Sequence, residues 1–156
     1  MRAVVQRVTK ASVTVDGEKI SEISDGLLVL LGIAKEDEEK DLDYIYRKVT
    51  NLRVFDDENG VMNKSLLDQG NDLLLVSQFT LYGDARKGNR PSYVRAAGFD
   101  DGVGFYEKFI EKAKQDNINI CTGKYGADMQ VELVNNGPVT ILLDSEKEFW
   151  FELQNY

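Results

Sequence analysis

Met129 to Leu143 reads MQVELVNNGPVTILL, an apolar run interrupted by one of the chain's two prolines. On either side of NNGPVT, Asn135 to Thr140, the run is typical of two strands that close a sheet. Proline has no N–H to donate to a sheet ladder, so Pro138 either breaks the run or serves a purpose there. Gly137 can adopt backbone angles closed to other residues, and only a bond to proline is cis at modest cost. The Gly-Pro step therefore predicts exposed backbone carbonyls rather than a reactive side chain.

Alternating apolar and polar residues predict strands over much of the remaining chain. Asp16-Gly17 and Asp25-Gly26 are turn signals of the kind that separates neighbouring strands in hairpins. The expected strands before residue 82 are Arg2 to Val8, Ala11 to Val15, Glu18 to Ile23, Leu27 to Ile33 and Leu73 to Leu81.

Two segments change to a helical period. After Asp37, apolar residues fall three or four apart, and acidic residues fill the first turn. These residues are Leu42, Ile45, Val49 and Leu52, and a second stripe consists of Val103, Tyr106, Phe109, Ile110 and Ala113. We therefore predict an α/β fold, with one domain over residues 1–156 and a mostly antiparallel or mixed, barrel-like β-sheet on which two helices pack.

The composition removes the usual catalytic groups. The 156 residues include no histidine and one cysteine. A Ser-His-Asp triad, a Cys-His dyad and an HExxH zinc site are therefore excluded. An enzyme of this composition must rely on backbone dipoles, hydroxyls, amides or its own substrate, and we expect neither a metal nor a cofactor. The acidic cluster from Glu36 to Asp43 is interpreted as a solvated helix start rather than a metal site.

The cysteine count, the lengths of the apolar runs and the net charge limit where the protein resides and what it binds. Cys121 has no second cysteine for an internal disulfide and is interpreted as a packing residue. The start of the chain has no long apolar stretch behind a basic head, and the apolar run from Leu27 to Ala34 is far shorter than the ~20 residues of a membrane helix. These features favour a cytoplasmic protein without a membrane segment. The net charge of −8 argues against broad, charge-driven binding of nucleic acid.

Polar residues interrupt the expected strand from Leu73 to Leu81, which reads LLLVSQFTL. Ser77, Gln78 and Thr80 need hydrogen-bond partners or a ligand in such a setting. They are either a satisfied polar edge of the sheet or part of a site. Thr80 as a nucleophile would need a base, and no histidine exists to serve. Backbone N–H groups around Phe79 and Thr80 are the alternative, as an oxyanion hole.

Four motifs together resemble one family. They are SQFTL at Ser77 to Leu81, NNGPVT at Asn135 to Thr140, QRVTKASVTVDG beginning at Gln6, and RPSY at Arg90 to Tyr93. In this order and spacing they are similar to the D-aminoacyl-tRNA deacylases of the bacterial and eukaryotic type. The resemblance covers nearly all of Met1 to Asp144, and the tail from Ser145 to Tyr156 extends beyond it with an open role.

The resemblance implies a homodimer with its active site at the subunit interface. Such an enzyme hydrolyses the ester between a D-amino acid, or glycine mischarged on tRNA-Ala, and the 3′-terminal adenosine of tRNA. The family's Gly-Pro step is cis and enters the partner's pocket, which corresponds here to Gly137 and Pro138. Its carbonyls hold the amino group so that an L side chain collides with protein. Arg7 corresponds to the residue that braces this loop, and Met129 to one beside the pocket.

The SQFTL segment is implied to form the other wall of the site. Ser77 and Gln78 would lie near the adenosine, and the main chain of Phe79 and Thr80 near the scissile carbonyl. An aminoacyl ester is already activated, and its ribose carries a 2′-hydroxyl that can position or deprotonate water. We therefore prefer substrate-assisted hydrolysis, with Gln78, Phe79 and Thr80 as the catalytic residues, over a covalent mechanism through Thr80.

The segment from Asp84 to Ala97, DARKGNRPSYVRAA, offers a local exception to the negative net charge. It carries four basic residues and one acidic residue. We predict that Arg86, Lys87 and Arg90 contact phosphates near the tRNA acceptor end, although a short basic stretch is by default a solvated loop.

Two interpretations concern the tail and the class of protein. Phe149, Trp150 and Phe151 are expected to pack against the domain or a partner subunit. The competing class of function is a non-catalytic, dimeric α/β module that binds a small ligand or a single-stranded RNA end through its exposed backbone. Release of the amino acid from tRNA distinguishes the enzyme from the binder.

Overall fold

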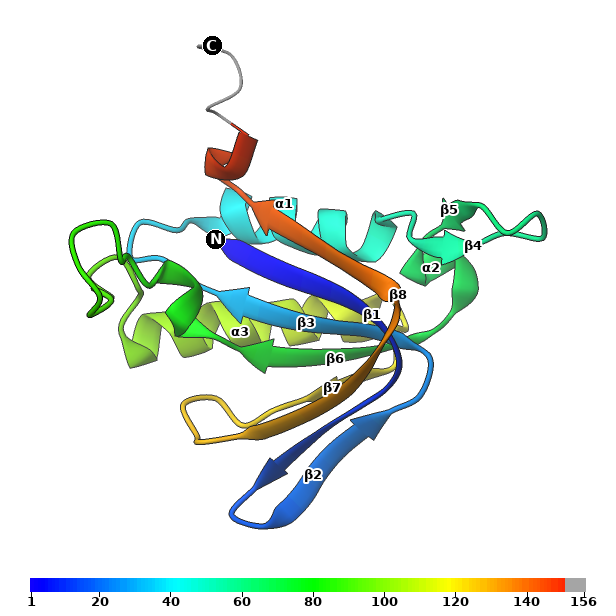
Figure 1. Cartoon of the computed structure of the whole chain (residues 1–156), viewed down its shortest axis with the longest axis horizontal. Helices are drawn as coiled ribbons and strands as arrows, with labels where there is room; N and C mark the ends of the chain where they lie inside the picture. The colour runs from blue at the N-terminus through cyan, green and yellow to red at the C-terminus, as the bar shows by residue number, and fades with distance from the viewer. Residues whose placement is uncertain (151–156) are drawn as a thin grey trace.

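The structure, a computed structural model, describes residues 1–150. It contains one curved, barrel-like sheet with helices on it, together with a small hairpin (Figure 1). The elements are β1 (Arg2–Val15), β2 (Glu18–Ile23), β3 (Gly26–Gly32), α1 (Glu39–Asn51), β4 (Phe55–Asp56), β5 (Met62–Lys64), α2 (Leu66–Gln69), β6 (Asp72–Ser77), the 3-10 helix η1 (Phe79–Tyr82), α3 (Phe99–Gln115), β7 (Ile120–Thr122), β8 (Gln130–Asp144) and the 3-10 helix η2 (Glu148–Trp150).

The sheet is mixed and is organised around β1. Its order is β2-β1-β3-β6-β7, and β8 pairs with β1 as well. The strands β2, β3 and β8 run antiparallel to β1, whereas β3, β6 and β7 run parallel to one another. One half of β1 pairs with β3 and the other half with β2, so the long strand must bend between them. The predicted α/β class with a mixed, barrel-like sheet is confirmed.

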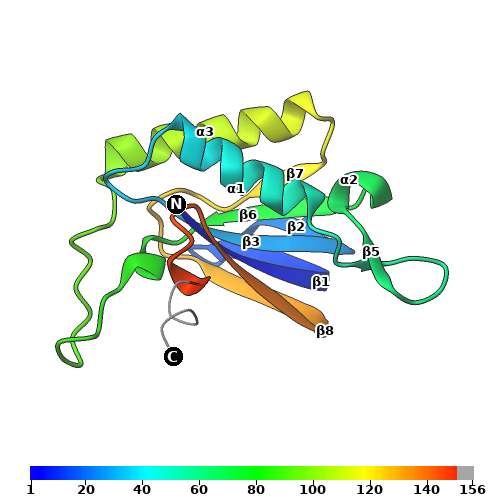
Figure 2. The same ribbon diagram turned by 90° about the horizontal axis from the view of Figure 1, so that it is seen from above.

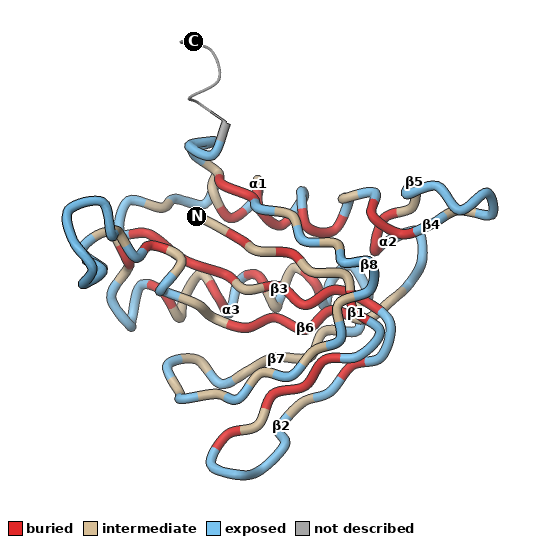
Figure 3. The backbone as a smooth tube through the Cα atoms, viewed as in Figure 1, coloured by how far each residue is buried: buried red, intermediate tan, exposed pale blue. Residues whose placement is uncertain are grey.

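The helices α1 and α3 lie on one face of the sheet (Figure 2). Their buried residues follow the predicted stripes and include Leu42, Ile45 and Phe109. These side chains pack on alternate residues of β1, such as Ala3 and Val5, in the main hydrophobic core. Figure 3 shows that the residues along the middle of β3 and β6 are buried and that those at the hairpin tips are exposed. No helix in residues 1–150 has the length and apolar character needed to cross a membrane.

The strand predicted from Leu73 to Leu81 is too long. β6 ends at Ser77, and η1 follows from Phe79 to Tyr82. The last ladder bond runs from the Gln78 N–H to the Leu31 carbonyl at 2.8 Å. η1 then packs on Gly32, where an added Cβ would lie 3.0 Å from the Leu81 Cβ and 3.1 Å from the Gln78 carbonyl oxygen. The chain therefore turns because glycine in the neighbouring strand leaves room for a helical turn.

Two further boundaries differ from prediction. The strands expected on either side of the Gly-Pro step belong to one element, β8, because both halves pair with β1 and a register shift absorbs the step. The two strands expected within residues 2–15 are likewise one strand, β1. The structure adds α2, β4, β5 and β7, which are short elements without a periodic signal.

The acidic cluster before α1 is only partly solvated. Glu38 and Asp41 form a reciprocal capping box at the start of the helix. The Asp37 side chain, however, is only 1% exposed and accepts a 2.6 Å hydrogen bond from the N-terminal ammonium of Met1. Burial raises the pKa of this carboxyl group, although the ammonium opposes the shift. The prediction of a fully solvated helix start is therefore wrong at Asp37.

Candidate functional site

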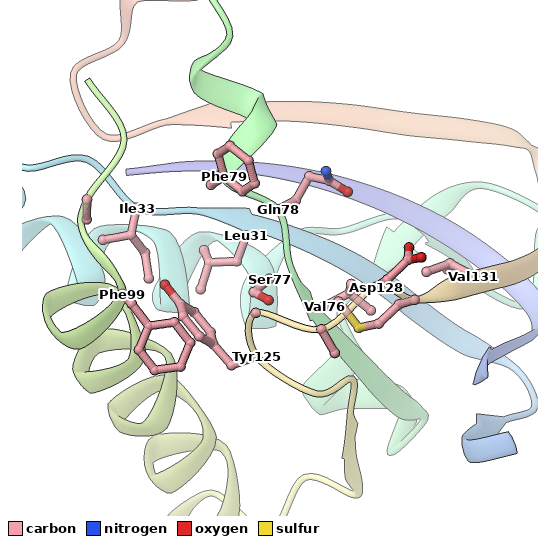
Figure 4. A pocket seen from close by; sticks show the side chains of 14 residues that line it. Leu31, Ile33, Val76, Ser77, Gln78, Phe79, Phe99, Tyr125, Asp128 and Val131 are labelled. Carbon is pink, nitrogen blue, oxygen red and sulfur yellow. The ribbon is translucent and has the colours of Figure 1, made fainter. Parts of the chain in front are cut away.

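A cavity of about 430 Å³ opens where β6 ends. Ser77, Gln78 and Phe79 line one side of it (Figure 4). The opposite side is formed by Phe99 at the start of α3 and by the loop of residues 125–129. The walls are therefore largely apolar and aromatic, with Ser77 and Gln78 near the end of the strand and the acidic Asp128 on the facing side. Apolar walls with a few polar groups are the usual character of a small-molecule site.

The change from strand to helix leaves main-chain donors beside this cavity. Within residues 1–150, neither the Phe79 N–H nor the Thr80 N–H has a hydrogen-bond acceptor. The first N–H groups of any helical turn lack intrahelical partners, so η1 presents two donors in succession. Phe79 is 57% exposed, and its ring packs edge-on against Tyr93. These two N–H groups are the arrangement expected of an oxyanion hole.

The side chains around η1 do not supply a base. The Gln78 amide donates a short hydrogen bond to the Thr80 hydroxyl. No imidazole exists in the chain, and burial raises the pKa of Tyr125 across the cavity above its ordinary value. The Thr80 hydroxyl is therefore held by an amide donor, and within residues 1–150 it donates no hydrogen bond to a side-chain acceptor.

The Gly-Pro loop is held by side chains that bind its main chain. The Gly137-Pro138 peptide bond is cis, and both residues are exposed. Arg7 donates from Nε to the Asn136 carbonyl at 2.9 Å and from Nη1 to the Val54 carbonyl at 2.7 Å. The Asn135 side chain accepts a 2.7 Å bond from the Val139 N–H. The loop is therefore fixed from behind and presents backbone groups outward.

The two halves of the expected site are not brought together within one chain. Arg7, behind the loop, lies opposite Leu27 of β3, whereas Ser77 lies opposite Leu31. The loop is thus displaced from the cavity by four residues along the strand direction and by three strands across the sheet, from β8 to β6. At about 3.3 Å per residue and 4.8 Å per strand, the separation is roughly 20 Å. Figure 1 likewise shows the bend of β8 and the turn after β6 at opposite ends of the sheet.

Of the other predicted site residues, one lies in the cavity. Met129 lines the cavity with Ser77, Gln78 and Phe79. Sequence reasoning missed Phe99, Tyr125 and other residues of the facing wall. The only signal for that wall was the turn-forming Gly126, which has a positive φ of 75° beside Tyr125.

The basic loop is less positive than its sequence indicates. Arg86 binds both carboxylate oxygens of Asp84, and this contact holds the pKa of Asp84 well below its usual range. Arg95 turns away to Glu146 and Glu148, with contacts of 2.9 and 3.1 Å. Lys87 and Arg90 are exposed and have no ion pair within residues 1–150. They are the remaining candidates for phosphate contact.

The tail and the single cysteine have structural contacts. Phe149 is exposed, and its ring centroid lies 5.1 Å from the Arg2 guanidinium. Trp150 ends η2, and Phe151 lies outside the described residues. Cys121 packs against a second core cluster that includes Val8, Leu28 and Leu74, and burial there raises the pKa of its thiol. No group of three or more potential metal-ligating side chains occurs in the described part of the chain.

The comparisons with known proteins agree on one family. The family model described as D-Tyr-tRNA(Tyr) deacylase matches residues 4–144. A D-aminoacyl-tRNA deacylase of Clostridium botulinum (strain Loch Maree / Type A3) is 58% identical over 149 residues, covering 96% of this chain and 100% of the relative. A D-aminoacyl-tRNA deacylase of Clostridium novyi (strain NT) is 55% identical with the same coverage.

Two solved structures share the fold. One, titled c-Myc DNA Unwinding Element Binding Protein, is 50% identical with a TM-score of 0.86, covering 92% of this chain and 98% of that one. Another, a probable eukaryotic D-amino acid tRNA deacylase, is 15% identical with a TM-score of 0.78, covering 91% and 97%, and supports the fold alone. From the family match and the near-complete coverage of its relatives, the chain belongs to the D-Tyr-tRNA(Tyr) deacylase family.

Proposed function

We propose that this protein hydrolyses the ester of D-aminoacyl-tRNA, releasing the D-amino acid and free tRNA. The observation that carries the proposal is the pair of unpaired N–H groups at Phe79 and Thr80, placed beside an apolar cavity in a chain of this family. Two donors in succession suit the oxyanion that develops when water attacks an ester carbonyl. Each such donor contributes about 3 kcal/mol to transition-state stabilisation in other enzymes.

The chemistry needs little from the side chains. A water oxygen attacks the carbonyl carbon, the oxyanion is held by the two N–H groups, and the bond to the ribose 3′-oxygen breaks. The adjacent 2′-hydroxyl of the substrate relays the proton from water to the leaving oxygen. Gln78 orients the Thr80 hydroxyl, and Ser77 and Met129 line the cavity that holds the substrate. In this assignment the carboxylate of Asp128, which lines the facing wall, is not required as a base, because the substrate's own hydroxyl relays the proton.

Chiral selection is assigned to the Gly137-Pro138 carbonyls of a second copy of the chain. Because the loop lies roughly 20 Å from the cavity of its own chain, it can act only on another copy. Docked there, its carbonyls bind the substrate ammonium, and an L side chain then meets protein. Glycine has no side chain to reject, so glycyl-tRNA-Ala is a second substrate. A tRNA substrate also assigns the protein to the cytoplasm.

An apolar row on the sheet supports a homodimer. Leu142, Val4 and Leu30 are successive register partners across β8, β1 and β3. They alternate with Ala3 and Val5, which face the helices, so the row lies on the opposite face of the sheet. Leu142 is 45% exposed in the single chain. Covering such a row with its own symmetric copy buries apolar surface on both subunits.

The activity is tested by incubating the protein with D-tyrosyl-tRNA and L-tyrosyl-tRNA. We expect release of D-tyrosine, with the L ester spared by a factor on the order of 100, because the rejection is steric. Gly137→Ala should strongly lower D-tyrosine release and reduce this selectivity, since its Cβ would lie 2.8 Å from the Val139 side chain and displace the carbonyls that bind the substrate. Binding of both tRNAs without release would instead support the non-catalytic module.

Replacing Thr80 distinguishes the two mechanisms. Thr80→Ala should retain turnover within about threefold, because only the main chain of Thr80 contacts the reacting ester. Thr80→Ser is the matched control that keeps the hydroxyl. Trapping of an acyl-threonine by rapid quenching and mass spectrometry would establish the covalent route instead.

Mixing two variants with strongly reduced turnover tests whether the site spans two subunits. Gly137→Ala displaces the donated carbonyls that bind the substrate ammonium. Phe79→Pro removes one of the two N–H donors of the receiving cavity, at the first position of η1, where proline is tolerated. After subunit exchange at equal concentrations, half of the dimers are mixed, and one of the two sites in each is intact. Activity should then recover to about one quarter of wild type. If both parts serve the site of their own chain, mixing restores nothing.

Charge reversal tests the phosphate contacts. Lys87→Glu with Arg90→Glu should weaken tRNA binding and lower the slope of log K against log salt by about 2, whereas Arg86→Glu alone should have a smaller effect because Asp84 already pairs with Arg86. Lys40→Glu with Lys114→Glu, on the helical side, is the charge-matched control. An unchanged slope in the loop variant would remove the loop from the interface.

A further inference from the structure

Arg2 directs all three guanidinium nitrogens at partners, one of which belongs to η1 at the edge of the cavity. Its Nη1 donates to the Leu81 carbonyl at 2.9 Å, its Nε approaches Asp144 at 3.3 Å and its Nη2 approaches Glu148 at 2.6 Å. The side chain is only 17% exposed. An arginine with every branch engaged and little solvent around it has one available geometry, because its planar fork fixes the directions of its donors.

The Leu81 carbonyl belongs to the short helix that carries the proposed oxyanion donors. Leu81 follows Thr80 directly in η1, and its carbonyl is one of the terminal acceptors that a helix leaves without an internal partner. The guanidinium of Arg2 also lies 4.6 Å from the ring centroid of the buried Tyr82. Arg2 therefore holds two successive residues at the end of η1.

Arg2 is itself placed by the sheet. It pairs in register with Asp144 of β8 and with Gly32 of β3. The Asp144 side chain is 1% exposed, so the ion pair is anchored in the interior rather than on a mobile surface. On its other side η1 rests on Gly32, where no Cβ fits without a shift. The helical turn is thus fixed between glycine in one strand and arginine in the next.

We propose that Arg2 is a positioning residue for ester hydrolysis, which sets the main chain of Phe79 and Thr80 through its bond to the Leu81 carbonyl. This inference rests on the proposed function and deepens it. Apart from Phe79, most of the cavity wall comes from β3, β6, the start of α3 and the loop of residues 125–129, so Arg2 acts mainly on the transition state rather than on binding. Displacements of the order of 1 Å at catalytic groups cost up to ~100-fold in rate.

The test is Arg2→Lys, assayed with D-tyrosyl-tRNA at varied concentration. Lysine keeps the charge near Asp144 and Glu148 but offers a single ammonium group, which cannot also serve the Leu81 carbonyl in the same geometry. We expect kcat to fall about tenfold with KM changed by less than about twofold. The matched control is Arg53→Lys, since the Arg53 Nε also donates to a carbonyl, that of Asn63, at 2.9 Å, far from the cavity. This control should change neither constant.

The outcomes separate this inference from the function on which it rests. A wild-type protein that releases no D-tyrosine overturns the proposed function, whereas an active wild type with unchanged kcat in Arg2→Lys overturns only the role of Arg2. A rise in KM with kcat unchanged would also overturn it. If Arg2→Lys does not fold, as judged by circular dichroism, Glu148→Gln replaces it, because it loosens Arg2 while leaving Asp144 and Leu81 in place. A kcat-selective loss of about two- to threefold is then expected, and an unchanged kcat in that folded variant overturns the proposal.

Discussion

The pairing of β1 on both of its edges is the constraint on which the rest of the structure depends. β1 is bound along its length by β8 on one edge and by β3 and then β2 on the other. A strand hydrogen-bonded on both sides cannot slip by one residue without moving its whole apolar set to the wrong face. The register of β1 therefore fixes what its side chains can reach.

Arg2 and Arg7 show how the register of β1 determines which main-chain groups its side chains bind. Arg2, near the start of β1, reaches the turn that carries Phe79 and Thr80, and Arg7, five positions later, reaches the loop that carries Gly137. Because strand side chains alternate, the two arginines project to opposite faces of the sheet. In both cases the guanidinium binds a carbonyl rather than an acid alone, so its effect is to place main chain. One strand thus positions both halves of the proposed site, roughly 20 Å apart.

Structural elements that depend on a local sequence pattern were predicted correctly. Features that depend on a contact with a segment distant in the sequence were not. The apolar stripes of α1 and α3 are periodic, and the turn at Asp16 is a strong signal, so the sheet and helices were recognisable. The end of β6 was not, because Phe79 and Leu81 continue the alternation of a strand and only the space above Gly32 shows that the chain turns. The ion pairs of Arg95 with Glu146 and Glu148 were also hidden, since about fifty residues separate the partners.

The same reasoning explains why the SQFTL and NNGPVT motifs were readable while the residues that support them were not. A site formed by main-chain groups is hard to recognise in a sequence, because every residue has a carbonyl and every residue except proline has an N–H. What the sequence must encode is the position of these main-chain groups, and glycine is its visible sign. Gly32 is needed where another chain segment approaches closely, and Gly137 where φ is positive. The supporting arginines look like ordinary strand residues until their partners are known. For a site built from backbone groups, the informative question is which side chains bind the main chain from behind. In the site proposed here, those side chains are Arg2 and Arg7, which bind the Leu81 and Asn136 carbonyls.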